Sequence, residues 1–103
     1  MWIVLNDAFL SVVSKRDSQT QLLVRARVRG DIERVFCDAE VFEDVDADYR
    51  YRSYIDRQAV SEAISDSISK IDYDNFKNSV SKDDRKRLDA YMNVWESLYR
   101  MQS

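Results

Sequence analysis

Histidine and proline are missing from the 103 residues of this sequence, and glycine and cysteine occur once each, as Gly30 and Cys37. Histidine is the side chain that titrates near neutral pH without help from its surroundings, so its absence removes the commonest general acid and base. A phosphate-binding loop needs several glycines, and a zinc site needs clustered cysteines and histidines. We therefore expect a protein that is not an enzyme and that holds no cofactor or metal ion.

The single cysteine has no partner for an intramolecular disulfide, which is typical of a reducing compartment. A reactive thiolate needs a base or a cationic neighbour, and without histidine we expect Cys37 to be a buried or half-buried structural thiol. No apolar run reaches the roughly 18 residues of a membrane span. The apolar residues 1–5 lack a basic flank, so no signal peptide is predicted. These absences predict a cytoplasmic protein that does not cross a membrane.

The composition that remains is typical of a folded chain. Hydrophobic residues make up 45% of the sequence and charged residues 34%, with a formal net charge of −3. This balance favours a globular protein over a disordered one, and a chain of this length suits one domain. We expect a single domain over residues 1–103, in which any affinity for nucleic acid depends on local basic patches rather than on net charge.

The first half of the chain has the two-residue period of β-strands. Residues 22–28 alternate apolar side chains with arginines, which is typical of a half-buried strand. Residues 8–13 are apolar and precede a polar turn, so the two segments predict an antiparallel hairpin. Further strands are expected at residues 39–42 and 49–55, with Tyr49, Tyr51 and Ile55 on one side of the last strand.

From Asp56 onward the period changes to that of helices. Val60, Ile64 and Ile68 recur at steps of four after Asp56, the expected N-cap. Asp31 is expected to cap a short helix over residues 32–36, and residues 81–84 resemble a capping box that opens a last helix. Strands come first and helices last. This order predicts an α+β fold, in which an antiparallel sheet of three or four strands packs against C-terminal helices.

Residues 38–48 form an acidic segment without any basic residue. The acids at positions 44, 46 and 48 match the first, third and fifth ligands of an EF-hand calcium loop. Tyr49 stands where that loop needs glycine, however, and Ile55 stands where it needs glutamate, so the segment does not predict a calcium site. Its carboxylates are Asp38, Glu40, Glu43, Asp44, Asp46 and Asp48.

The acidic segment has two other interpretations. Its carboxylates could dock on a basic protein partner by long-range attraction, or imitate the phosphates of a nucleic acid. The alternative is a solvated loop whose charges keep an edge strand from pairing with other chains. The sequence leaves both interpretations open.

Arginines alternate along two of the expected strands. Arg25 and Arg27 share one side of the first strand, and Arg50, Arg52 and Tyr54 share one side of the second. If the strands pair with those sides aligned, the guanidiniums gather on one face and could hold phosphates beside a stacking ring. The alternative is that this basic face pairs internally with the acidic segment, or is simply solvated.

The last expected helix is rich in aromatic residues. Tyr91, Trp95 and Tyr99 recur at steps of four, and packing against the sheet is the simplest explanation, above all for Trp95. Met92, Tyr99 and Met101 spread beyond a narrow stripe, and surplus tyrosine, tryptophan and methionine are typical of partner surfaces. We therefore expect Tyr99 to contribute to a partner contact, with a homodimer as one form of it.

Two stretches resemble a pattern in short, uncharacterised bacterial and prophage-type proteins. They are IDYDNFK at residues 71–77 and YMNVW at residues 91–95, and the start of the chain at residues 2–10 has a similar character. The resemblance implies no activity and assigns no functional residue. It implies a setting in which compact acidic proteins inhibit a host machine, anti-CRISPR proteins among them.

Two hypotheses follow. The first is a small binding module that docks on a protein partner through the acidic segment and Tyr99, as a phage or mobile-element inhibitor of a nucleic-acid-handling complex. The second is direct binding of nucleic acid or phosphate, with these residues as the site: Arg25, Arg27, Arg50, Arg52 and Tyr54.

Overall fold

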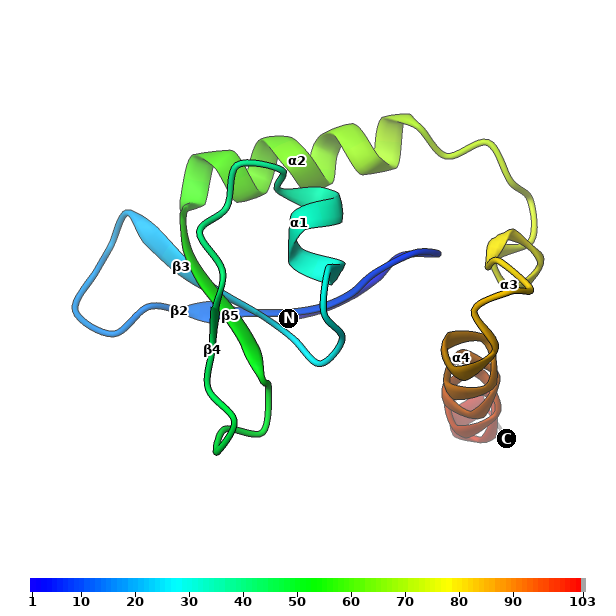
Figure 1. Cartoon of the computed structure of the whole chain (residues 1–103). Helices are drawn as coiled ribbons and strands as arrows, with labels where there is room; N and C mark the ends of the chain where they lie inside the picture. Colours follow the sequence, from blue (N-terminus) through cyan, green and yellow to red (C-terminus); the bar gives the residue numbers. More distant parts are fainter. Residues whose placement is uncertain (103) are drawn as a thin grey trace. The chain divides into compact units, whose positions relative to one another are not determined.

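The computed structural model describes residues 1–102 of the chain (Figure 1). The chain divides into two compact units, Met1–Ile71 and Asp72–Ser103. A sheet in the N-terminal half followed by helices confirms the predicted α+β class. That residues 1–103 form a single domain stays a prediction.

The first unit contains a five-stranded sheet in which every neighbouring pair is antiparallel, in the order β1-β2-β3-β5-β4. The expected strands are all present, although the segment at 39–42 contributes only its last residue. One strand, β1, was not expected, because three residues are too few to show a period. The strands are β1 (Trp2–Val4), β2 (Phe9–Ser14), β3 (Gln21–Ala26), β4 (Phe42–Glu43) and β5 (Tyr51–Asp56).

Strand β3 ends earlier than the alternation in residues 22–28 predicts. β3 stops at Ala26, and Val28, expected among the inward residues, is half exposed. A turn follows at once, since the Asp31 amide donates to the Val28 carbonyl and Gly30 adopts a positive φ of 94°. Only glycine adopts that backbone conformation without strain, so the single glycine of the chain stands where the chain must leave the sheet.

Helices α1 (Asp31–Val35) and α2 (Arg57–Ser69) cover one face of the sheet (Figure 1). Ile32 of α1 and Val60 of α2 join the same buried cluster as Leu10 and Val24 from the strands. Burying such aliphatic side chains stabilises the unit by about 1.5–3 kcal/mol each. The helix predicted from Asp56 onward is confirmed, with Asp56 at the N-cap position but without a side-chain capping bond.

The start of α1 corrects one prediction. Gly30, not Asp31, is the N-cap, and Asp31 is the first residue of the helix. Its carboxylate is fully buried, accepts the Phe9 amide of β2 at 3.0 Å and pairs with Arg34 at 2.8 Å. Asp31 therefore ties α1 to the sheet rather than capping the helix.

The second unit contains α3 (Phe76–Ser79), α4 (Arg85–Tyr99) and a terminal 3-10 turn, η1 (Arg100–Gln102). The predicted capping box at residues 81–84 is wrong in detail, because Asp84 is the N-cap and accepts the Arg87 amide. Phe76 of α3 stacks on Tyr91 of α4, with ring centroids 5.8 Å apart. This contact joins the two helices, and the ion pair of Arg87 with Asp84 stabilises the first turn of α4.

Cys37 corrects another prediction, since it is exposed rather than buried. It follows α1 in the loop that leads to β4, outside the buried cluster. Within the described residues, no helix is both long and apolar enough to cross a membrane.

Candidate functional site

The face of the sheet opposite α1 and α2 is called the open face here, because both helices of the first unit pack on the other side. Directly paired residues of antiparallel strands point to the same face. The register therefore defines one row of side chains across all five strands on the open face. In strand order this cross-strand row is Trp2, Ser11, Arg25, Arg52 and Phe42.

At the centre of the row, Arg25 of β3 and Arg52 of β5 are direct partners. The sequence hypothesis required these two strands to pair with their arginine sides aligned, and they do. Like charges directly opposite each other destabilise a sheet by up to about 1 kcal/mol. The open face thus keeps two cations together at a cost to folding.

The guanidiniums of the open face bond only to neutral oxygens. Arg25 donates to the Ser11 hydroxyl at 2.7 Å, and Arg52 donates to the Tyr49 carbonyl at 3.2 Å. Arg27, just beyond β3, donates to the Asp48 carbonyl at 2.7 Å. None of the three forms an ion pair with any residue of the described chain. Their positive charges are therefore held in place but not neutralised.

Tyr49 connects two of these arginines and corrects a prediction. Its ring was expected on the same side of the strand as Tyr51, but β5 begins only at Tyr51, so Tyr49 does not follow the alternation. The ring is almost fully buried, with the Arg25 guanidinium 4.6 Å and the Arg27 guanidinium 4.1 Å from its centroid. The Nε atom of Arg25 is buried without an acceptor, a second cost of this arrangement.

Arg50 does not join the cluster, which corrects the expected set. Its guanidinium pairs with Glu43 at 3.1 Å, and Arg29 pairs with the same carboxylate at 2.7 Å. Glu43 is the direct partner of Tyr51, so its side chain lies on the covered side of the sheet edge. Hydrogen bonds from Arg50 and then Arg29 lower the pKa of Glu43 below its ordinary value of 4.5. Internal pairing with the acidic segment is thus real for Arg29 and Arg50.

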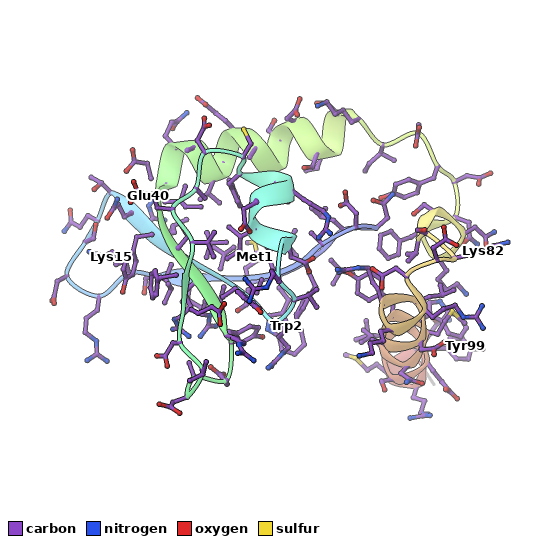
Figure 2. The ribbon with its side chains drawn as sticks, viewed as in Figure 1. Met1, Trp2, Lys15, Glu40, Lys82 and Tyr99 are labelled. Carbon is purple, nitrogen blue, oxygen red and sulfur yellow. The ribbon has the colours of Figure 1, made fainter. Side chains whose placement is uncertain are left out.

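Aromatic rings stand at both ends of the cross-strand row. Trp2 contacts Phe9 edge-to-face at 6.0 Å between centroids, and Phe42 contacts Tyr54 at 5.5 Å. Tyr54 was expected on this face and lies there, with the Lys15 ammonium 4.9 Å from its ring centroid. Trp2 and Lys15 are labelled in Figure 2. Sequence reasoning missed Trp2, Phe42 and Lys15, since only the register shows that they share a face with Arg25.

The acidic segment lies along β4 and the turn that follows it. Asp38 and Glu40 are exposed before β4. In the turn, the Asp44 carboxylate accepts the Asp46 amide at 3.1 Å, and the Asp48 carboxylate accepts the Tyr49 amide at 2.9 Å. Two of its carboxylates therefore stabilise the β4–β5 turn, and Glu43 binds two arginines. The segment has structural roles that its composition did not reveal.

Helix α4 places Tyr99 in an exposed aromatic pair. The rings of Trp95 and Tyr99 stack with centroids 5.3 Å apart, and the Lys77 ammonium lies 3.9 Å from the Trp95 centroid. Both rings are about half exposed within the described structure, and the packing of Trp95 against the sheet stays a prediction.

The chain matches no protein-family model, no curated protein and no solved structure. The resemblance to short bacterial and prophage-type proteins therefore stays a prediction. Among residues 1–102, no group of three or more cysteine, aspartate or glutamate side chains is arranged to hold a metal ion. The open face is the part of the described molecule with the most unusual chemistry.

Proposed function

We propose that the open face binds nucleic acid through its phosphates, with Arg25, Arg27 and Arg52 as the contact residues. The observation that supports this most strongly is the bonding of these three guanidiniums, which involves neutral oxygens and no carboxylate. Guanidinium groups bind phosphate oxygens in charge-assisted, bidentate hydrogen bonds. An anionic ligand would neutralise charges that the folded unit leaves unneutralised.

The direct pairing of Arg25 with Arg52 adds a second reason. Two cations on adjacent strands repel each other, and a phosphate between them would turn that repulsion into attraction. A feature that weakens folding and strengthens binding is typical of a functional surface. The ordering of the two guanidiniums by Ser11 and Tyr49 means that little side-chain freedom remains to be lost on binding.

The test is a fluorescence-anisotropy titration of a labelled oligothymidine strand at two salt concentrations. With three phosphate contacts on a single strand, log K should fall with log salt at a slope of about −2, or roughly 20-fold between 50 and 200 mM salt. Arg52→Gln should weaken binding and reduce that slope by about 0.7. Circular dichroism and thermal unfolding would confirm that the variant is folded.

Arg85→Gln is the matched control, because it removes the same charge from an exposed position at the start of α4. It should reduce the affinity only by the small amount expected from a change of one unit in net charge. Absence of salt-dependent binding, or equal effects of Arg52→Gln and Arg85→Gln, would overturn the proposed function.

A second candidate is docking of the acidic segment on a basic protein partner, as an inhibitor of a nucleic-acid-handling complex. Its support is that Asp44, Asp46 and Asp48 are exposed in one turn and form no ion pair with a described residue. Two of these carboxylates, those of Asp44 and Asp48, also accept the hydrogen bonds that stabilise the turn.

One charge-reversal experiment distinguishes the two candidate functions. In a pull-down from a bacterial lysate analysed by mass spectrometry, Asp46→Lys should remove a captured basic protein while leaving oligonucleotide binding intact. Asp46 is the suitable position because its side chain accepts none of the turn hydrogen bonds described above. An unchanged set of captured proteins would count against the second candidate.

A further inference from the structure

The open face combines its cations with aromatic rings that are accessible at both ends of the cross-strand row. Trp2 is 71% exposed at the β1 end, and Tyr54 is 48% exposed near the other end. Phe42, which contacts Tyr54, is 40% exposed. The exposure of large aromatic rings to water is unfavourable. Three such rings on one sheet face are typical of a surface that a ligand covers.

These rings are held in fixed positions rather than free to collapse onto the sheet. Trp2 lies at 81° to the Phe9 ring, so that Phe9 supports its edge. The Tyr54 ring is bounded by Phe42 on one side and by the Lys15 ammonium on another. A ring that is supported but half exposed can stack with a flat ligand at a low entropic cost.

We infer that the open face binds a single strand of nucleic acid, with one base stacked on Trp2 and another on the Phe42–Tyr54 pair. The phosphates between those bases would lie over Arg25 and Arg52. This inference rests on the proposed function and goes beyond it, because phosphate contacts alone would be equally compatible with a duplex. The aromatic positions decide between the two forms.

A single strand is the form that these rings can recognise. In a duplex the face of every base is covered by its neighbours, so an aromatic side chain meets only the outer backbone. In a single strand the base faces are accessible, and stacking on aromatic rings gives affinity with little sequence preference. Guanidiniums between stacking rings then follow the backbone, as in other surfaces that bind single strands.

The length of the row limits the length of the bound strand. Five strands have four spacings of about 4.8 Å, so the row spans about 19 Å. Stacked bases rise about 3.4 Å each, so that span corresponds to roughly six stacked nucleotides, and to fewer when the bases are separated. We expect the affinity to stop increasing once the oligonucleotide is longer than about six residues.

The experiment uses Trp2 as its own reporter. Trp95→Phe removes the other tryptophan of the chain while keeping an aromatic ring in α4. In that background, a labelled oligothymidine should quench the fluorescence of Trp2 as it binds. A blunt-ended DNA duplex, inorganic polyphosphate and polyglutamate serve as control ligands, because they carry charge but have no unpaired bases.

Substitutions then locate the stacking positions. Trp2→Ala and Tyr54→Ala should each weaken single-strand binding by about 5- to 150-fold, while Trp2→Phe should restore most of the affinity. Both residues are exposed, so the variants should stay folded, which thermal unfolding would check. Tyr99→Ala removes an equally exposed ring from α4 and should leave binding unchanged.

The outcomes distinguish the two levels of the proposal. Salt-dependent binding that is equal for duplex and single strand, or insensitive to Trp2→Ala, would overturn the single-strand inference and leave the proposed function standing. Equal binding of polyphosphate or polyglutamate without quenching of Trp2 would also overturn the inference. Absence of binding to every nucleic acid would overturn both.

Discussion

The two faces of the five-stranded sheet follow different physical rules. On the covered face, Leu10 and Val24 are fully buried against α1 and α2, and the buried hydroxyl of Ser53 donates to the Glu40 carbonyl at 2.8 Å. On the open face, Arg25 opposes Arg52, and one buried nitrogen of Arg25 lacks an acceptor. The covered face is arranged for stability, and the open face retains unfavourable features that folding alone does not explain. This difference is the reason for placing function on the open face.

The largest expected effect is a difference between the two faces in their contribution to stability. Leu10→Ala on the covered face should reduce the free energy of unfolding by about 2–5 kcal/mol, because it leaves a cavity in a fully packed cluster. Leu23→Ala on the open face should cost less than half of that, since Leu23 is already partly exposed. Urea unfolding of both variants measures the difference, and equal losses would contradict the division between the faces.

The tie between α1 and the sheet should have the next largest effect. Asp31→Ala leaves the Phe9 amide without its acceptor and should reduce the free energy of unfolding by about 1–3 kcal/mol. Asp31→Asn should cost less, because an amide oxygen can still accept the Phe9 amide. Thermal unfolding measures both, and Asp38→Ala, at an exposed position in the next loop, is the control with no expected effect.

A substitution on the open face tests whether Arg52 contributes to binding rather than to stability. Arg52→Gln relieves a repulsion with Arg25 and keeps a donor for the Tyr49 carbonyl, so the free energy of unfolding should stay within about 0.5 kcal/mol of the original value or rise. The same variant should lose nucleic-acid affinity. A clear loss of stability would show that Arg52 is present for folding and would weaken the case for the open face.

The smallest effect concerns the acidic edge of the sheet. Arg50 and Arg29 hold the pKa of Glu43 below its ordinary value of 4.5 in the folded state. Stability from this carboxylate is therefore complete above pH 4.5 and is lost as the pH falls through the lowered pKa. Between about pH 6 and about pH 3, the melting temperature should fall more steeply for the original protein than for Glu43→Gln. Parallel curves would show that these ion pairs are too solvated to matter.

Several features of the site followed from the sequence, and the reasons for the failures are physical. The alternation in residues 22–28 correctly placed the side chains of Arg25 and Val24 on opposite faces of the sheet, because the two-residue period of a strand is a local property. The same reasoning failed for Tyr49 and Arg50, which precede the first residue of β5. A strand begins where a partner strand is available, and that partner lies far away in the sequence. Trp2 was missed for a related reason, since β1 exists only by pairing with β2.

The change from a two-residue to a helical period is enough to predict the α+β class, and the same periods show which residues carry charge on β3 and β5. The pairing of Arg25 with Arg52, and of Arg29 and Arg50 with Glu43, depends on the strand register and the folded β4–β5 edge. Periodicity is encoded by neighbouring residues, whereas register is a choice among long-range pairings, and a shift of one residue moves every side chain to the other face. The absence of histidine excluded many activities at the outset, but the register is what assembled an arginine and aromatic surface from what remained.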